Sequence, residues 1–315
     1  MNRAKQRQPA GLTAKTAKLG LMKANLYALA AIALWASLAT LGVSLKHVPP
    51  FLLTGIALAL GSMLTWPSAL KDRLQWTVAP STLSLGVFTL FGYHFLLFIG
   101  LRLAPAVEVN LINYLWPLLI VVLASLYLPG LRLRGVHIAA AAIGFAGAAI
   151  AILGGREAAA STLDQPGWGA LPGYLLALGS AFIWANYSLQ TKRAELTGKS
   201  FPTASIGLFG LLSGVLSLAC HWALEPAIVL NGHDWLLLLV LGLGPLGAAF
   251  LLWDKALKLG DVRHVGLLSY LTPLASTVLL MQFTGRTLSW HIALAAALII
   301  GAALLGMRRA RVPAQ

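Results

Sequence analysis

The sequence predicts an all-α membrane protein in which ten transmembrane helices form two inverted repeats of five. Composition indicates the membrane class, because 58% of the 315 residues are hydrophobic and only 10% are charged, whereas soluble domains carry about 25% charged residues. A duplication indicates the repeats, since Tyr-Leu-x-Pro occurs at 114–117 and again at 270–273. An odd number of helices per repeat reverses the second copy in the membrane, so the copies must be inverted.

Ten apolar stretches are long enough to cross a hydrocarbon core of about 30 Å, which takes roughly 20 helical residues. They must be helices, because lipid-exposed backbone groups have to be hydrogen-bonded within the segment. In chain order the predicted helices are 24–45, 49–66, 78–102, 105–128, 134–153, 170–190, 203–223, 234–256, 261–284 and 288–307.

Further matches between the halves define the domain boundaries. Leu-Trp-Ala at 34–36 corresponds to Ile-Trp-Ala at 183–185, and His-Ile-Ala occurs at 137–139 and 291–293. We therefore predict five regions: a cytoplasmic basic tail over 1–23, a first five-helix repeat over 24–153, an extracytoplasmic linker over 154–169, a second repeat over 170–307 and a cytoplasmic tail over 308–315.

The net charge of +14 is distributed as in a multi-pass membrane protein. With a cytoplasmic N-terminus, every Lys and Arg lies on the inner side except Lys46, Arg102, Arg156 and Arg286. This asymmetry is the positive-inside pattern and predicts that both termini are cytoplasmic. A nucleic-acid partner is not expected, because it would require a basic face on a soluble domain.

The tryptophans fall into two groups. Six lie near predicted helix ends, where amphipathic rings favour the membrane interface: Trp66, Trp76, Trp168, Trp222, Trp235 and Trp290. Trp35, Trp116 and Trp184 lie near the middle of their helices, where each indole N–H needs a partner. Both cavity lining and ordinary packing remain open for these three.

Polar residues cluster in the same helices, and polar groups inside a membrane are costly unless they are paired or face a cavity. An interhelical hydrogen bond is the alternative role for each, and a structural role is the alternative for His94. The candidate cavity residues are Trp35, Tyr93, His94, Asn110, Asn113, Tyr114, Trp116, Trp184, Tyr187, Ser269 and Tyr270. Pro117 and Pro273 are candidate hinges, because each removes a backbone donor; a fixed kink is the alternative.

Carboxylates are absent from the middle of the predicted helices. Glu108 lies near an outer end, and Asp254 lies near an inner end with Lys258 four residues away, at ion-pair spacing. No pair of histidines, cysteine cluster or phosphate-binding loop has the spacing that a metal or nucleotide site requires. We therefore predict no catalytic residues, no metal and no cofactor. A passive channel stays open as an alternative, although no ring of like charge is visible.

Two long segments resemble one known module. The run from "GLRLAPAVEVNLINYLWPL" to "GAAIAIL" and the run from "ALKLGDVRHVGLLSYLTPL" to "GAALLGM" are similar to the EamA repeat of the drug/metabolite transporter superfamily. Many members have Gly-Glu after the fourth and ninth helices, whereas this chain has Pro129-Gly130-Leu131 and Gly285-Arg286-Thr287, so no role is transferred to that acid.

The resemblance implies a basket of ten helices in a bacterial inner membrane, which exports aromatic and other apolar amino acids by alternating access. The expected partners are a small-molecule solute and the lipid bilayer. Export of drugs or other metabolites is the alternative among carriers. The residues do not decide between a monomer and a homodimer.

Overall fold

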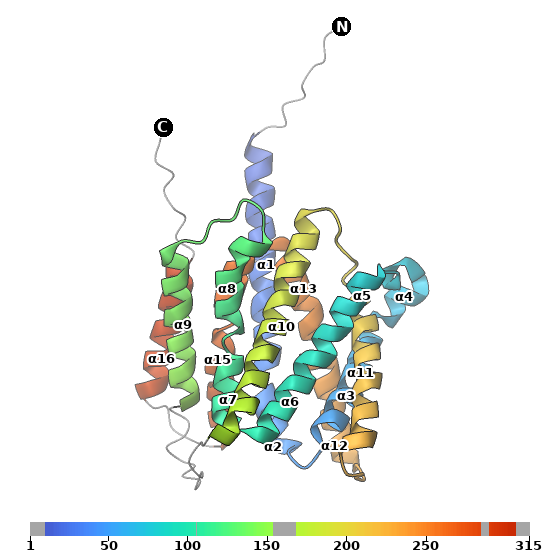
Figure 1. Cartoon of the computed structure of the whole chain (residues 1–315). Coiled ribbons are helices and arrows are strands. Elements are labelled where there is room, and N and C mark those ends of the chain that lie inside the picture. Colours follow the sequence, from blue (N-terminus) through green and yellow to red (C-terminus); the bar gives the residue numbers. More distant parts are fainter. Residues whose placement is uncertain (1–9, 105, 154–167, 285–289, 307–315) are drawn as a thin grey trace.

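A computed structural model describes residues 10–104, 106–153, 168–284 and 290–306 of the chain (Figure 1). The described residues form helices and connecting turns, and no strand occurs among them. Residues 1–9, most of the predicted linker 154–169 and the predicted tail 308–315 lie outside the described part of the chain.

The described residues of the first half form nine α-helices. They are α1 Ala10–Ala36, α2 Leu38–Ser44, α3 Pro50–Ser62, α4 Trp66–Lys71, α5 Pro80–Val87, α6 Tyr93–Leu103, α7 Ala106–Asn113, α8 Trp116–Tyr127 and α9 Gly135–Leu153. The helix α1 starts well inside the predicted tail 1–23. The physical reason is the Ala-, Lys- and Leu-rich sequence of that stretch, since these residues favour a helix even in water.

In the second half, the part that the structure describes forms seven α-helices: α10 Leu171–Leu196, α11 Ser205–Leu224, α12 Gly232–Leu243, α13 Ala249–Leu259, α14 Val262–Leu268, α15 Leu271–Thr284 and α16 Trp290–Gly306. Six helical spans of the described residues are long and apolar enough to cross a membrane, and two shorter helices, Gly135–Ile150 and Trp290–Leu305, are also apolar. The chain is therefore an α-helical multi-pass membrane protein.

The helices are interrupted at matching places in the two halves. A π-helical turn, η3 Phe88–Gly92, separates α5 from α6, and a second, η6 Gly244–Ala248, separates α12 from α13. Two residues of non-helical turn at 114–115 separate α7 from α8, and two at 269–270 separate α14 from α15. Pro117 and Pro273 follow these breaks closely, and a proline lacks the N–H that would bond to the carbonyl four residues earlier, which disfavours a continuous helix there.

Helices from the two halves pack against each other throughout the molecule. The pairs α9 with α16 and α3 with α11 lie side by side, and α10 runs through the middle against α6 and α8 (Figure 1). Small residues permit the closest approach: a Cβ on Gly214 of α11 would lie 2.9 Å from the Gly55 carbonyl oxygen of α3. A side chain there would push the two helices apart, so Gly214 permits the close contact of α3 and α11.

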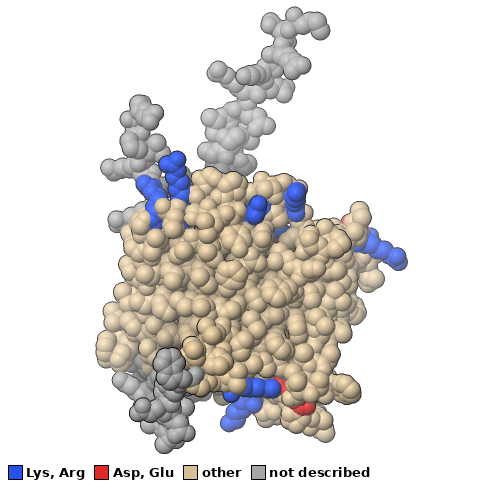
Figure 2. All heavy atoms as spheres, in the orientation of Figure 1, with Lys and Arg blue, Asp and Glu red and all other residues tan. Residues whose placement is uncertain are grey.

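The visible charges lie apart from the middle of the bundle on one face. On the face shown in Figure 2, Lys and Arg lie near the two ends, and the wide band between them carries no charged side chain. Four of the tryptophans predicted at helix ends have highly exposed side chains, as an interfacial position requires: Trp66, Trp222, Trp235 and Trp290. An uncharged band of this kind suits contact with lipid.

Candidate functional site

A cavity of about 510 Å³ lies between helices of both halves. Eight of the predicted cavity residues line it: Trp35, Tyr93, His94, Asn110, Asn113, Tyr114, Trp116 and Trp184. They come from α1, α6, α7, α8 and α10 and from the turn between α7 and α8, so the breaks in the helices bring together residues from distant parts of the sequence. Phe98 and Phe250 add further aromatic surface that the sequence did not single out.

Three predicted residues lie in the packed interior and are not among the described residues that line this cavity. Tyr187 is buried beside Trp184, with ring centroids 5.9 Å apart. Ser269 is fully buried, and its hydroxyl donates to the Gly266 carbonyl at 2.5 Å. Tyr270 is also fully buried; its ring fills the space over Gly144 of α9, where a Cβ would lie 2.5 Å from the ring.

This placement corrects the assumption that Tyr114 and Tyr270 play the same part. The two tyrosines occupy equivalent positions of the repeated motif, but only Tyr114 lines the cavity. Gly144 leaves a slot into which the ring of Tyr270 packs. Motif symmetry could not show this, because the slot belongs to another helix.

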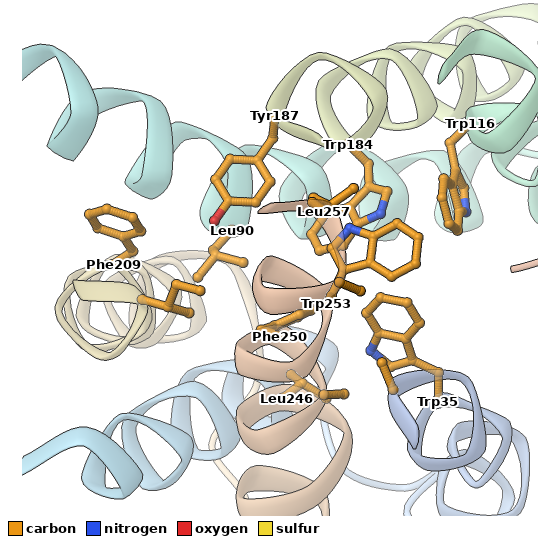
Figure 3. Packing of buried hydrophobic residues seen from close by; sticks show 14 of the residues in the cluster. Trp35, Leu90, Trp116, Trp184, Tyr187, Phe209, Leu246, Phe250, Trp253 and Leu257 are labelled. Atoms are coloured by element: carbon orange, nitrogen blue, oxygen red, sulfur yellow. The ribbon is translucent and has the colours of Figure 1, made fainter. Parts of the chain in front are cut away.

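Four tryptophans from both halves meet beside the cavity, and three of them line it (Figure 3). Trp253 of α13 is completely buried, with its ring centroid 5.2 Å from that of Trp35 and 5.5 Å from that of Trp116. Trp184 completes the cluster, 5.8 Å from Trp35 and 6.4 Å from Trp116. Tilted and edge-to-face contacts at these distances are favourable, so the cluster forms a rigid floor.

The indole N–H groups of this floor have partners in the protein. Trp35 Nε1 donates to the Pro245 carbonyl at 3.1 Å, and Trp253 Nε1 donates to the Ser188 hydroxyl at 3.3 Å. Because Pro245 belongs to the π-helical turn η6, this irregular turn supplies an acceptor to the floor. Sequence reasoning missed Trp253, because Asp254 and Lys255 follow it directly and suggest a helix end at the membrane surface.

Beyond the floor, a buried ion pair links α13 to the segment between α10 and α11. Lys258 Nζ lies 2.7 Å from Asp254 Oδ2, which confirms the predicted i,i+4 pair. Thr203 donates to the same carboxylate oxygen at 2.5 Å, and Lys258 donates to the Phe201 carbonyl at 2.7 Å. These bonds hold the inner ends of α10, α11 and α13 together.

The polar groups of one cavity wall form a chain of hydrogen bonds. The Ser180 hydroxyl donates to Asn113 Oδ1 at 2.9 Å, and Asn113 Nδ2 donates to the Tyr93 hydroxyl oxygen at 3.0 Å. Both polar atoms of the Asn113 side chain are thus bonded within the protein, while the hydroxyl hydrogen of Tyr93 is left to donate. Asn113 therefore fixes the position of the Tyr93 hydroxyl.

His94 follows the π-helical turn η3 and combines the two roles that the sequence left open. Its ring lines the cavity, and its Nδ1 lies 2.6 Å from the Leu90 carbonyl oxygen. This bond fixes the orientation of the His94 ring. The His94 and Tyr93 rings meet edge to face, with their centroids 5.0 Å apart.

A buried carboxylate that sequence reasoning missed lies at the start of α3, next to the cavity residue Pro50. The Glu225 side chain is fully buried and accepts bonds from the backbone N–H groups of Phe51 and Leu52 at the start of α3. It also lies 2.8 Å from Arg102 of α6 and 3.0 Å from His221 of α11. One side chain thus joins the outer ends of three helices.

The cavity has little fixed charge. Lys46, which follows α2 at the outer end, is the only Lys, Arg, Asp or Glu among the described residues of its lining. Within the described ranges, no three His, Cys, Asp or Glu side chains are close enough together to hold a metal ion. The arrangement suits a solute with a flat apolar ring and a small polar head, since the rings offer stacking surfaces and the other walls offer hydrogen bonds.

Comparison with known proteins gives one family and several relatives. The model of the EamA-like transporter family matches residues 22–153 and again residues 171–308. The "Aromatic amino acid exporter YddG" of Ancylobacter novellus is 40% identical over 291 residues, which cover 91% of this chain and 98% of that protein. The proteins of the same name from Salmonella typhimurium and Escherichia coli are 29% and 27% identical, over 85% and 90% of this chain and 91% and 96% of theirs.

A solved structure has a similar fold. A crystal structure matches this chain with a TM-score of 0.81 and 38% sequence identity, and the match covers 90% of this chain and 97% of the other. The similarity therefore extends over nearly the whole helical bundle.

Proposed function

Because the chain belongs to the EamA-like transporter family, we propose that it exports aromatic and other apolar amino acids across a bacterial inner membrane. The family and the named relatives are transporters and not enzymes, in agreement with the sequence prediction. The observation that carries the choice of solute is the cavity of about 510 Å³, which has three tryptophans, two tyrosines and a single fully charged side chain in its lining. Drugs or other metabolites are the second class of solute.

We further propose ten membrane crossings in two inverted repeats, with both termini in the cytoplasm. The two family matches, one in each half, support a duplicated unit. The π-helical turns and the helix breaks at equivalent places support it independently. The division into repeats at 24–153 and 170–307 agrees in outline with these matches.

We also propose transport by alternating access, with the present arrangement open to the outside. The cavity reaches Lys46 and Pro50 at the end where α2 terminates. The close packing of the tryptophan cluster and the Asp254–Lys258 pair support a closed state at the other end. Rotation of the helix segments at the breaks before Pro117 and Pro273 would open the inner end, which is the hinge role proposed for these two prolines.

Counterflow in proteoliposomes tests the transport function. Vesicles preloaded with phenylalanine should take up labelled phenylalanine faster than empty vesicles. A carrier that has released unlabelled phenylalanine outside returns to the inner side with labelled phenylalanine bound, whereas a passive channel would show no such acceleration. Replacement of Trp116 or Trp184 with Ala should abolish the effect, whereas the exposed Trp290→Ala variant should retain it. Equal losses in all three variants would show that these tryptophans act through stability.

Cysteine labelling in intact cells tests the topology. In a Cys220→Ala background, a cysteine at Val229, which is 96% exposed, should react with an impermeant maleimide added outside. A cysteine at Arg193, at the inner end of α10, should react only after permeabilisation. Labelling of both positions from outside would exclude the inverted arrangement.

A further inference from the structure

The two copies of Tyr-Leu-x-Pro differ at their third position, which is Trp116 in the first repeat and Thr272 in the second. Both residues line the same cavity. We propose that Thr272, together with Ser276 one turn later on α15, binds the carboxylate of the transported amino acid, while Trp116 contacts its ring. This inference rests on the proposed function and names the part of the site that recognises the head group.

The hydroxyl of Thr272 is an unused hydrogen-bonding group. The residue is 6% exposed, and its Oγ1 has no hydrogen-bond partner among the described residues. Its neighbours differ: the Ser269 hydroxyl donates to Gly266, and the Thr277 hydroxyl donates to Pro273 at 2.8 Å. A buried hydroxyl without a partner costs stability. The oxygen is almost inaccessible here, so a carboxylate oxygen would bond to it once the Thr272 side chain turns toward the cavity that the residue lines.

Ser276 extends the same polar surface outward. Residues four apart lie on one face of a helix, and both Thr272 and Ser276 line the cavity. The helix α15 packs against α2, which leads to Lys46 at the mouth. Hydroxyl donors followed by a cation form a path that favours a carboxylate over an ammonium group.

The rest of the wall suits the ring and the ammonium group. No carboxylate is present among the described lining residues, so the ammonium must rest on neutral groups. The faces of Trp35, Trp116 and Trp184 attract a cation and also stack with an aromatic ring. The solute is therefore held with its ring on the floor and its carboxylate toward α15.

Thr54 is the other cavity residue with a buried, unpartnered hydroxyl. The lining residues closest to it on α3 are Pro50 and Leu53, which offer no second donor and no charge. The pairing of two hydroxyls on one helix face distinguishes α15 from α3 as the carboxylate subsite.

Competition against phenylalanine counterflow tests the assignment. Two competitors each lack one charged group: 3-phenylpropionate has no ammonium, and phenethylamine has no carboxylate. Thr272→Val and Ser276→Ala should each weaken inhibition by 3-phenylpropionate about tenfold, since a hydrogen bond to a charged group is lost, and should leave phenethylamine inhibition unchanged. Thr272→Ser, which restores the hydroxyl, should restore the wild-type inhibition.

The matched control is Thr89→Val, which removes another buried, unpartnered hydroxyl that lies outside the cavity lining. This variant should leave inhibition by both competitors unchanged. Unchanged inhibition by 3-phenylpropionate in the Thr272 and Ser276 variants would overturn the proposal. A loss of inhibition by phenethylamine alone would also overturn it. A wild-type protein that shows no phenylalanine counterflow would instead contradict the proposed function itself, so the two failures are distinguishable.

Discussion

The hydrogen-bond chain from Ser180 through Asn113 to Tyr93 leads to a quantitative prediction for a pair of substitutions. Asn113→Leu removes the donor that holds the Tyr93 hydroxyl at 3.0 Å but leaves that hydroxyl in place. Ser180 keeps a partner, because its hydroxyl also donates to the Ala177 carbonyl at 2.7 Å. The substitution therefore acts mainly on the orientation of Tyr93.

The magnitude follows from the cost of one neutral hydrogen bond, about 1 kcal/mol. Asn113→Leu should raise the half-saturation concentration for phenylalanine counterflow about fivefold. Tyr93→Phe should raise it at least as much, because it removes the hydroxyl altogether. The double variant should match Tyr93→Phe, since Asn113 has no further task once that hydroxyl is gone.

The outcome that refutes this reasoning is additivity. If the half-saturation concentration of the double variant is about fivefold higher than that of Tyr93→Phe, Asn113 contacts the solute directly. The sequence alone would allow this role, because it places Asn113 among the candidate cavity residues. The matched control is Asn186→Leu, because Asn186 accepts a bond from the Tyr127 hydroxyl at 2.9 Å outside the cavity lining. It should leave the half-saturation concentration unchanged.

Three further predictions concern the two ends of the cavity and the helix breaks. Glu225→Ala should destabilise the detergent-solubilised protein by about 1–3 kcal/mol in thermal unfolding, because the backbone N–H groups of Phe51 and Leu52 lose their acceptor; the exposed Glu195→Ala should cost under about 0.5 kcal/mol. Trp253→Ala should increase the passive leak of phenylalanine from loaded vesicles. An unchanged leak would show that the tryptophan floor is not the barrier to phenylalanine at the inner end. Pro117→Ala and Pro273→Ala should slow counterflow at least about tenfold while unfolding at the normal temperature; normal rates would indicate a fixed kink.

Two of the predicted apolar helices agree closely with the structure in their bounds, because a long apolar run between polar turns marks both ends of a helix. The predicted helices 134–153 and 203–223 correspond to α9 Gly135–Leu153 and α11 Ser205–Leu224. The π-helical turns could not be predicted, because they depend on tertiary contact. At η6, a Cβ on Gly247 would lie 2.4 Å from the Gly242 carbonyl oxygen, and no local pattern reveals so tight a turn.

The site was predictable where a residue is unusual for its depth in the membrane. Trp35 and Trp184 stood out as aromatic residues in mid-helix, and both line the cavity. Thr272 and Lys46 did not stand out, because a threonine in an apolar helix bonds to its own backbone in most cases, and a lysine in a loop is ordinary. Their importance depends on which residues surround the cavity, and only the folded chain supplies that information.

The two copies of Tyr-Leu-x-Pro share the proline and differ in the residue before it. Both copies retain the proline of Tyr-Leu-x-Pro and the break before it, so both halves carry the same interruption at mid-membrane. The position just before the proline became a tryptophan in one copy and a threonine in the other. An aromatic amino acid is itself unsymmetrical, with a ring at one end and charges at the other. A symmetric cavity would offer the same surface to both ends, whereas this divergence lets matched positions of one scaffold hold chemically different parts of a single solute.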